Sequence, residues 1–238
     1  MKNKKIAVVT GSNRGLGLGA VKTLAKKGYK VFLTARDSAK GEKEAKALQV
    51  EGFDVEFLSL DTASEKSIEF FAAVLAKKTD HIDVLINNAG VFLDSRDGGG
   101  ASALHTKGST LVDTLQTNTV GPFLLSQKLI PLLQKSSAGR IVNVSSGMGQ
   151  LSEMNAGYAA YRISKTALNA VTKILAEELK GSNILVNSVC PGWVKTDMGG
   201  PGAERNLEEG VASILFAATL PAGGPTGGYF RDGKPLQW

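Results

Sequence analysis

The sequence is poor in the residues that build disulfides and zinc sites. Its 238 residues include one cysteine, Cys190, and two histidines, His81 and His105. A single cysteine excludes an internal disulfide and a metal site made of several cysteines, and two histidines exclude a histidine-rich zinc site. We therefore expect no metal, and we expect Cys190 to be a small buried apolar side chain.

Long apolar runs are also missing. Behind the charged start at residues 1–5, the first apolar run covers only Ile6 to Val9. A signal peptide needs about 7–15 apolar residues in a row, and a membrane-spanning helix needs about 20. Collagen-like and coiled-coil periods are absent, and a hydrophobic content of 42% excludes a disordered chain. We expect a globular, cytoplasmic protein without a membrane partner.

Excess positive charge is confined to the start of the chain. Residues 1–50 contain twelve Lys or Arg and three acidic residues, a net charge of +9, whereas residues 51–238 contain sixteen basic and nineteen acidic residues, a net charge of −3. Nucleic acid, a membrane surface or a phosphorylated small molecule could use such a field, and solvated helix faces are the alternative. The sequence has no recognised nucleic-acid module and no stripe of aromatic and basic residues, so we expect no nucleic acid.

Short β-branched runs alternate with amphipathic stretches along most of the chain. Such alternation predicts βαβ units, and apolar strands without polar alternation predict a parallel sheet covered by helices. We predict one Rossmann-like, doubly wound α/β domain over residues 1–238, with a mostly parallel seven-stranded sheet and helices on both faces. The expected strands are residues 6–9, 30–34, 55–60, 84–86, 140–144 and 184–189, and the expected helices include residues 15–28, 39–51 and 64–78.

Two longer helices are predicted in the middle of the chain. Residues 158–180 align one apolar face, because leucine and valine recur there at spacings of three and four. Residues 107–135 are also helical in pattern, and Pro131 should end or kink this helix. The irregular segments are residues 94–103, which contain three consecutive glycines, and residues 199–202 and 221–228.

The first strand leads directly into a glycine-rich turn, Thr10-Gly11-Ser12-Asn13-Arg14-Gly15-Leu16-Gly17. The three glycines, spaced GxxxGxG, let the turn be tight and let backbone N–H groups approach a pyrophosphate at the positive end of the following helix. A plain strand-to-helix corner is the alternative. After the first strand of a βαβ chain, such a turn favours a dinucleotide site.

Five further motifs follow this TGxxxGxG turn at residues 10–17. They are NNAG at residues 87–90, a helix asparagine at Asn118, a strand-end serine at Ser146, YxxxK from Tyr161 to Lys165, and Pro191-Gly192 after the sixth strand. Together, in this order and over essentially the whole chain, the six motifs resemble the short-chain dehydrogenase/reductase family. A YxxxK pair alone arises easily by chance, so its weight comes from the order and context of the other motifs.

Tyr161 and Lys165 are one helical turn apart and share a face. A cation beside a phenol lowers the pKa of the tyrosine, so we expect Tyr161 to be an acid or base near neutral pH. The resemblance implies that Tyr161 exchanges a proton with the substrate oxygen and that Lys165 also holds the nicotinamide ribose. It further implies that Ser146 hydrogen-bonds the substrate oxygen and that Asn118 supports a water and proton path to Lys165. Ser146 is preferred to Ser145 because it lies further beyond the strand end.

The resemblance also implies a nicotinamide cofactor. The residues expected to bind it are Gly11, Asn13, Arg14, Gly15, Leu16, Gly17, Arg36, Asp61, Thr62, Asn88, Ala89, Gly90, Tyr161, Lys165, Pro191, Gly192, Val194 and Thr196. A carboxylate at the end of the second strand would bind a free ribose 2′-hydroxyl, whereas an arginine would bind a 2′-phosphate. That position is Ala35, Arg36 follows it, and Arg14 adds a second cation, so we expect NADP(H) in preference to NAD(H). Asp37 leaves the use of NAD(H) open.

The predicted function is NADPH-dependent reduction of a ketone, aldehyde or quinone to an alcohol by hydride transfer. Residues 225–238 resemble the carbonyl-reductase branch of the family. The alternatives are a β-ketoacyl-carrier-protein reductase, another hydroxy-compound dehydrogenase, or a dinucleotide-binding regulator without turnover. A regulator needs no acid or base, so the intact Ser146, Tyr161 and Lys165 argue against it.

Within the single domain, residues 1–120 are expected mainly to bind the cofactor, and residues 118–238 mainly to supply the catalytic and substrate side. Monomeric carbonyl reductases insert a helical segment before the tyrosine, but here only fourteen residues separate Ser146 from Tyr161. Without that insertion, apolar helices could pair with their copies about a two-fold axis. We expect a homodimer or homotetramer whose other partner is a small carbonyl or alcohol substrate.

Overall fold

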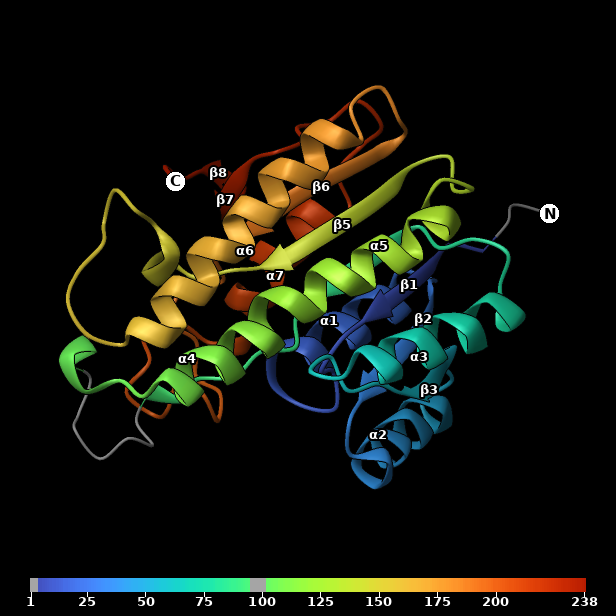
Figure 1. Ribbon diagram of the computed structural model, residues 1–238. Helices are drawn as coiled ribbons and strands as arrows, with labels where there is room; N and C mark the ends of the chain where they lie inside the picture. The colour runs from blue at the N-terminus through green and yellow to red at the C-terminus, as the bar shows by residue number, and fades with distance from the viewer. Residues whose placement is uncertain (1–3, 95–101) are drawn as a thin grey trace.

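A computed structural model describes residues 4–94 and 102–238, and it has one eight-stranded sheet with the strand order β3-β2-β1-β4-β5-β6-β7-β8 (Figure 1). Strands β1 to β7 are parallel to one another, and β8 is antiparallel to β7. The strands are β1 Ile6–Val9, β2 Lys30–Ala35, β3 Val55–Ser59, β4 Val84–Asn87, β5 Gly139–Val144, β6 Ile184–Val189, β7 Tyr229–Arg231 and β8 Lys234–Pro235.

The expected sheet of seven strands is wrong by one strand. Asp232 and Gly233 both have positive φ, 53° and 75°, so the chain reverses tightly after β7. The two residues that follow then pair with β7 as the edge strand β8. A proline is tolerated there because the edge strand of a sheet needs no second row of hydrogen bonds.

Helices cover both faces of the sheet, as predicted, and each face has its own apolar core. In β1, Ala7 and Val9 belong to the core under α1, α2 and α7, whereas Ile6 and Val8 belong to the core under α3, α5 and α6. Successive side chains of a strand point to opposite faces, so one apolar strand serves both cores. Outside the middle of the chain, the helices are α1 Gly15–Lys26, α2 Ser38–Val50, α3 Glu65–Lys78, α6 Ala159–Glu178 and α7 Leu207–Ala218.

The helical stretch in the middle of the chain is interrupted at a different place from the expected one. It consists of α4 (Gly108–Leu115), a π-helical turn (Gln116–Val120) and α5 (Gly121–Leu133), and α5 continues past Pro131. At Gly121 the helix lies so close to the segment after β3 that an added Cβ would be 2.1 Å from the carbonyl oxygen of Thr62. In the segment 94–103, predicted to be irregular, residues 95–101 lie outside the described residues.

The carboxyl ends of the parallel strands lie at one edge of the sheet, and most of the predicted cofactor-binding residues follow these ends. The strand order reverses between β1 and β4, which are neighbours although β2 and β3 intervene in the sequence. Open α/β sheets bind ligands in the crevice at such a switch point. Among residues 4–94 and 102–238, no helix is both long and apolar enough to cross a membrane.

Candidate active site

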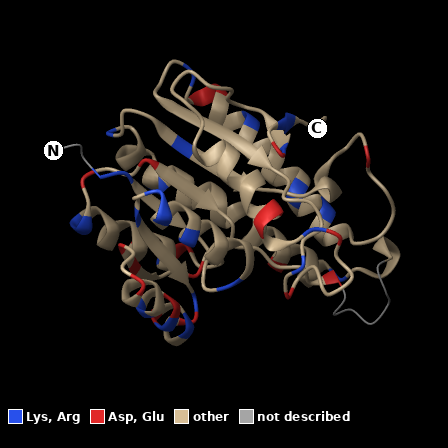
Figure 2. Cartoon of the chain, turned by 180° about the vertical axis from the view of Figure 1, so that it is seen from behind, with Lys and Arg blue, Asp and Glu red and all other residues tan. Residues whose placement is uncertain are grey.

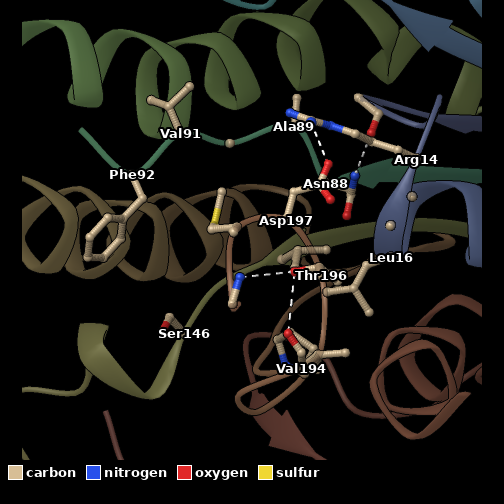
Figure 3. Close-up of a pocket in the computed structure, with 18 of the residues that line it drawn as sticks. Arg14, Leu16, Asn88, Ala89, Val91, Phe92, Ser146, Val194, Thr196 and Asp197 are labelled. Atoms are coloured by element: carbon tan, nitrogen blue, oxygen red, sulfur yellow. Dashed lines mark hydrogen bonds and ion pairs between the residues drawn. The ribbon is translucent and has the colours of Figure 1, made fainter. Parts of the chain in front are cut away.

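A cavity of about 1580 Å³ opens at the carboxyl edge of the sheet, and it exceeds the usual range of about 300–1,000 Å³ for ligand pockets. Every residue predicted to bind the cofactor lines it, as do Ser146, Tyr161 and Lys165. In Figure 3, Phe92 and Ser146 lie on one side of the view and Arg14 and Leu16 on the other. The cavity therefore contacts both the glycine turn and the predicted acid/base groups.

The glycine turn packs closely against the segment after β4 and also lines the cavity. At Gly11, which has a φ of 58°, an added Cβ would lie 2.8 Å from the Cα of Ala89, and at Gly17 it would lie 2.5 Å from Nδ2 of Asn88. Side chains cannot occupy these positions because of this close packing, and the backbone at the start of α1 lines the cavity. This cradle, with helix α1 directed at it, fits a pyrophosphate group.

Asn88 and Thr10 bond the segment after β4 to the glycine turn. The Asn88 side chain donates to the carbonyl oxygens of Thr10 (2.8 Å) and Gly11 (3.1 Å). In return, the Thr10 hydroxyl accepts the backbone N–H groups of Asn88 and Ala89, each at 2.9 Å. These four hydrogen bonds hold the glycine turn against the segment after β4. Within the NNAG motif, the side chain of the second asparagine, Asn88, makes this connection.

Ser146 and Tyr161 are held together by contacts between a short 3-10 helix (Gly147–Gly149) and α6. The Ser146 hydroxyl caps this 3-10 helix by accepting the N–H of Met148 (3.2 Å). The carbonyl oxygen of Gly149 accepts hydrogen bonds from Thr166 (3.1 Å) and Asn169 (3.2 Å), both on α6. The neighbouring Ser145 is directed elsewhere, because its hydroxyl donates to the carbonyl of Lys165.

The electrostatics of Tyr161 and Lys165 differ from the expectation. Burial raises the pKa of Tyr161 to about 12, although hydrogen bonding with Ser146 acts in the opposite direction. Burial also lowers the pKa of Lys165 to about 8, although the negative charge of a Cys190 thiolate would raise it. The expected lowering of the tyrosine pKa by the lysine is therefore wrong. The Lys165 ammonium donates to Val144 O at 2.8 Å and lies 5.6 Å from the Tyr161 ring centre, and loss of hydration has the larger effect on both pKa values.

Asn118 is buried in the π-helical turn and holds the segment after β4. Its Oδ1 accepts the N–H of Val91 (2.8 Å), while its Nδ2 donates to Val91 O (2.9 Å) and to the hydroxyl of Ser164 (3.0 Å). Asn118 is the one predicted site residue outside the cavity lining. It still lies near Lys165, because a Cβ added at Gly90 would be 3.3 Å from Asn118 Oδ1 and 3.5 Å from Lys165 Nζ.

Three charged side chains at the rim of the cavity have different surroundings. Arg14 forms an ion pair with Asp197 across the cavity mouth at 2.6 Å (Figure 3). Asp37 caps α2 by accepting the N–H of Lys40 (3.1 Å) and pairs with the same lysine, and these bonds lower its pKa. Arg36 is exposed, and in the described part of the chain its side chain has no hydrogen bond or ion pair.

Cys190 is buried, as expected, but its surroundings are polar, so the expectation of an apolar role is wrong. Its Sγ accepts the N–H groups of Gly147 (3.1 Å) and Gly192 (3.4 Å) and lies 3.0 Å from Nη2 of Arg231. Cys190 and Arg231 both line the cavity. The thiol therefore links the loop after β5, through Gly147, to the Pro191-Gly192 segment after β6.

Part of the cavity lining is an apolar wall that the sequence analysis did not identify. Phe92, Met148, Tyr158, Trp193 and Met198 line it. They lie on the segments that follow β4, β5 and β6 and at the start of α6, and a sequence pattern does not show which of these side chains face one another. Within residues 4–94 and 102–238, no group of three or more His, Cys, Asp or Glu side chains could hold a metal ion.

Comparison with known proteins identifies the family. The family model for short chain dehydrogenases matches residues 5–206. The chain belongs to the short chain dehydrogenase family. Members of this family are oxidoreductases, so this protein is one as well.

Individual members of the family are similar over nearly the whole chain. Carbonyl reductase (NADPH) 1 of Macaca fascicularis is 32% identical, and the alignment covers 98% of each chain. The NADPH-bound carbonyl reductase from chicken fatty liver has a TM-score of 0.88 at 28% identity, with 99% of each chain covered. The carbonyl reductase Sniffer of D. melanogaster has a TM-score of 0.87 at 33% identity, again with 99% of each chain covered.

The buried Lys165 makes the stability of the ligand-free protein depend on pH. Below pH 8 the lysine is charged in both the folded and the unfolded state, and the folded state bears the full desolvation cost. Between its folded pKa of about 8 and its ordinary value of 10.5, the unfolded state binds more protons, so stability rises with pH. Relative to Lys165→Met, the wild type should gain about 3 kcal/mol of stability between pH 7 and pH 10.5.

Urea unfolding of both ligand-free proteins at several pH values measures this difference. The hydrogen bond to Val144 that the variant lacks shifts the curves by a constant and does not change their relative slope. A difference in unfolding free energy that stays constant over this pH range would contradict the desolvated lysine.

Proposed function

We propose that this protein reduces the carbonyl group of a ketone, aldehyde or quinone to an alcohol with NADPH. The proposal rests on one observation: Ser146, Tyr161 and Lys165 line the same cavity as the glycine turn. The family members named above that are carbonyl reductases support the choice of reaction. When bound, the nicotinamide supplies the hydride.

Tyr161 is the proton donor of the proposed reaction. Its raised pKa, about 12, keeps the phenol protonated at neutral pH, as reduction requires. The hydroxyl of Ser146 hydrogen-bonds the same substrate oxygen and stabilises the charge that develops on it. Lys165 keeps most of its charge at pH 7 with a pKa of about 8, and that charge favours loss of the tyrosine proton to the substrate. Asn118 supports the path that returns a proton to Lys165.

The glycine turn and the rim select the cofactor in this proposal. Residues 1–120 mainly hold the adenosine and pyrophosphate half, and residues 118–238 mainly hold the nicotinamide and the substrate. Arg36 has a free guanidinium for a 2′-phosphate. Asp37 is already engaged as the cap of α2, which supports NADPH over NADH.

Tyr161→Phe should lower kcat by about 100-fold or more, because the variant lacks the proton donor. NADPH binding should persist, because the phenyl ring keeps the shape of the site. Turnover on a panel of carbonyl compounds, together with NADPH fluorescence titration, measures both quantities. Tyr29→Phe is the matched control, since Tyr29 is also buried but does not line the cavity. Full activity of Tyr161→Phe would overturn the proposed chemistry.

Arg36→Asp should weaken NADPH binding on the order of 100-fold, because a charged hydrogen bond to phosphate is lost and a like charge is introduced. NADH binding should change much less. Lys26→Asp serves as the control, since Lys26 is exposed and absent from the cavity lining. Equal losses in the two variants would assign the effect to the general positive field and not to a phosphate contact.

A β-ketoacyl-carrier-protein reductase would use the same reacting groups. The apolar wall of Phe92, Met148 and Trp193 favours a small apolar carbonyl compound. Parallel assays of turnover with simple ketones, quinones and acetoacetyl thioesters separate the two functions. Much faster turnover of the thioesters would indicate a β-ketoacyl-carrier-protein reductase.

The proposed enzyme is a cytoplasmic homodimer or homotetramer. Helix α6 carries exposed apolar side chains at Ile163 (46%) and Ile174 (55%), and their spacing of eleven residues places them on one face. Val120, at the junction of the π-helical turn and α5, is also exposed. A second copy of the chain could cover this face about a two-fold axis.

Ile174→Arg should convert the oligomer to a smaller species, because a charge in an apolar interface loses its hydration without a partner. Size-exclusion chromatography with light scattering measures the mass of both proteins. A monomeric wild type would contradict the proposed assembly.

A further inference from the structure

Helix α6, which carries Tyr161, begins without a cap of its own. Its N-cap residue Tyr158 has left-handed backbone angles, φ 53° and ψ 44°, and its side chain makes no capping hydrogen bond. The first N–H groups of a helix have no partner within the helix and need acceptors from elsewhere. Tyr161 lies in this first turn, so its own backbone N–H is one of these groups.

Asp94 supplies the missing acceptors from the segment after β4. Its Oδ1 accepts the N–H of Ala160 at 2.9 Å, and its Oδ2 accepts the N–H of Tyr161 at 3.0 Å. The carboxylate is 97% buried, since only 3% of Asp94 is exposed. A negative charge at the amino end of a helix also interacts favourably with the helix dipole, and hydrogen bonds to ionised groups are strong.

The same segment also contacts the tyrosine rings. The Phe92 ring, which Figure 3 places at the wall of the cavity, lies 4.8 Å from the ring of Tyr161 and 5.2 Å from that of Tyr158. Phe92 lies two residues before Asp94 in the segment after β4. Phe92 restrains the side chain of Tyr161, while Asp94 restrains the backbone of Tyr161. Asn118 anchors the start of the segment through Val91.

We propose that Asp94 is a positioning residue that sets the place of Tyr161 relative to Ser146 and Lys165. Asp94 bonds only the backbone of α6, so it acts through Tyr161 and does not touch the substrate. The inference rests on the proposed role of Tyr161 as proton donor. A displacement of a reacting group by about 1 Å can lower a rate by up to 100-fold, so a buried carboxylate that fixes this backbone controls turnover.

Asp94→Asn keeps the shape of the side chain but removes its charge and one acceptor oxygen. It should lower kcat on the order of 10-fold, while the KM for the carbonyl substrate and the Kd for NADPH stay as in the wild type. Rates are expressed per NADPH-binding site, so that loss of folded protein does not imitate a slower reaction. Asp94→Glu keeps both acceptor oxygens but places them on a longer side chain that shifts the first turn of α6, so its kcat should lie between that of the wild type and that of Asp94→Asn.

Asp83→Asn is the matched control. Asp83 is also a buried aspartate that accepts two hydrogen bonds, from the N–H of Ile6 (2.7 Å) and the hydroxyl of Ser136 (2.5 Å). It lies just before β4, at the amino edge of the sheet, opposite the cavity. Asp83→Asn should lower the thermal midpoint as Asp94→Asn does, but it should leave kcat per site unchanged.

The outcomes separate this inference from the proposed function. A lower kcat in Asp94→Asn, together with an unchanged kcat in Asp83→Asn, supports the inference that Asp94 positions Tyr161. If both variants keep wild-type kcat, or both lose it equally, Asp94 has only a structural role. If Tyr161→Phe is fully active, the proposed function itself fails. Should Asp94→Asn not fold, Asp94→Glu carries the test: its longer side chain shifts the first turn of α6, and wild-type kcat in that variant overturns the inference.

Discussion

The docking of α6 against the end of β5 is the constraint on which the site depends. The Lys165 ammonium donates to the last carbonyl of β5, that of Val144, at 2.8 Å, and the carbonyl of Gly149 takes two further bonds from α6. An added Cβ at Gly149 would lie 2.8 Å from the backbone of Lys165, so only glycine permits this approach. These bonds and the close approach at Gly149 tie the helix to the strand-end loop, and they thereby hold Ser146 and Tyr161 at a fixed separation.

This close docking also sets the charge states of the site. Tyr161 is 9% exposed and Lys165 is 4% exposed, and burial disfavours the ionised form of each group. At neutral pH the Tyr161 phenol is therefore neutral, and the Lys165 ammonium holds its proton weakly. These two groups are suited to giving a proton to a substrate oxygen. Burial of the Lys165 ammonium lowers the stability of the folded state. Its hydrogen bond to one carbonyl only partly compensates for the hydration that the ammonium loses. Burying the reacting groups thus opposes stability.

The sequence predicted those parts of the site that depend on local pattern, and it missed those that depend on packing. Gly17 and most of the other motif residues line the cavity, because strand ends and helix starts follow from periodicity. The direction of the Tyr161 pKa shift was wrong because spacing shows that a lysine is near but not how much water both groups lose. Asp94 was missed because its partners on α6 are far away in the sequence, and a carboxylate in a predicted loop gives no sign of such a bond. The strand at Pro235 was missed because proline argues against strands, except at an edge.

The charge of the first fifty residues has a different meaning once its partners are known. Figure 2 shows basic and acidic residues alternating along α2, so much of the positive charge there is balanced nearby. Lys40 is paired with Asp37, and Arg14 is paired with Asp197. Such exposed pairs contribute little to stability, but they occupy the cations that a phosphate would otherwise contact. Arg36, which has no partner among the described residues, can bind a phosphate without first breaking an ion pair, and this supports its proposed role in selecting the phosphorylated cofactor.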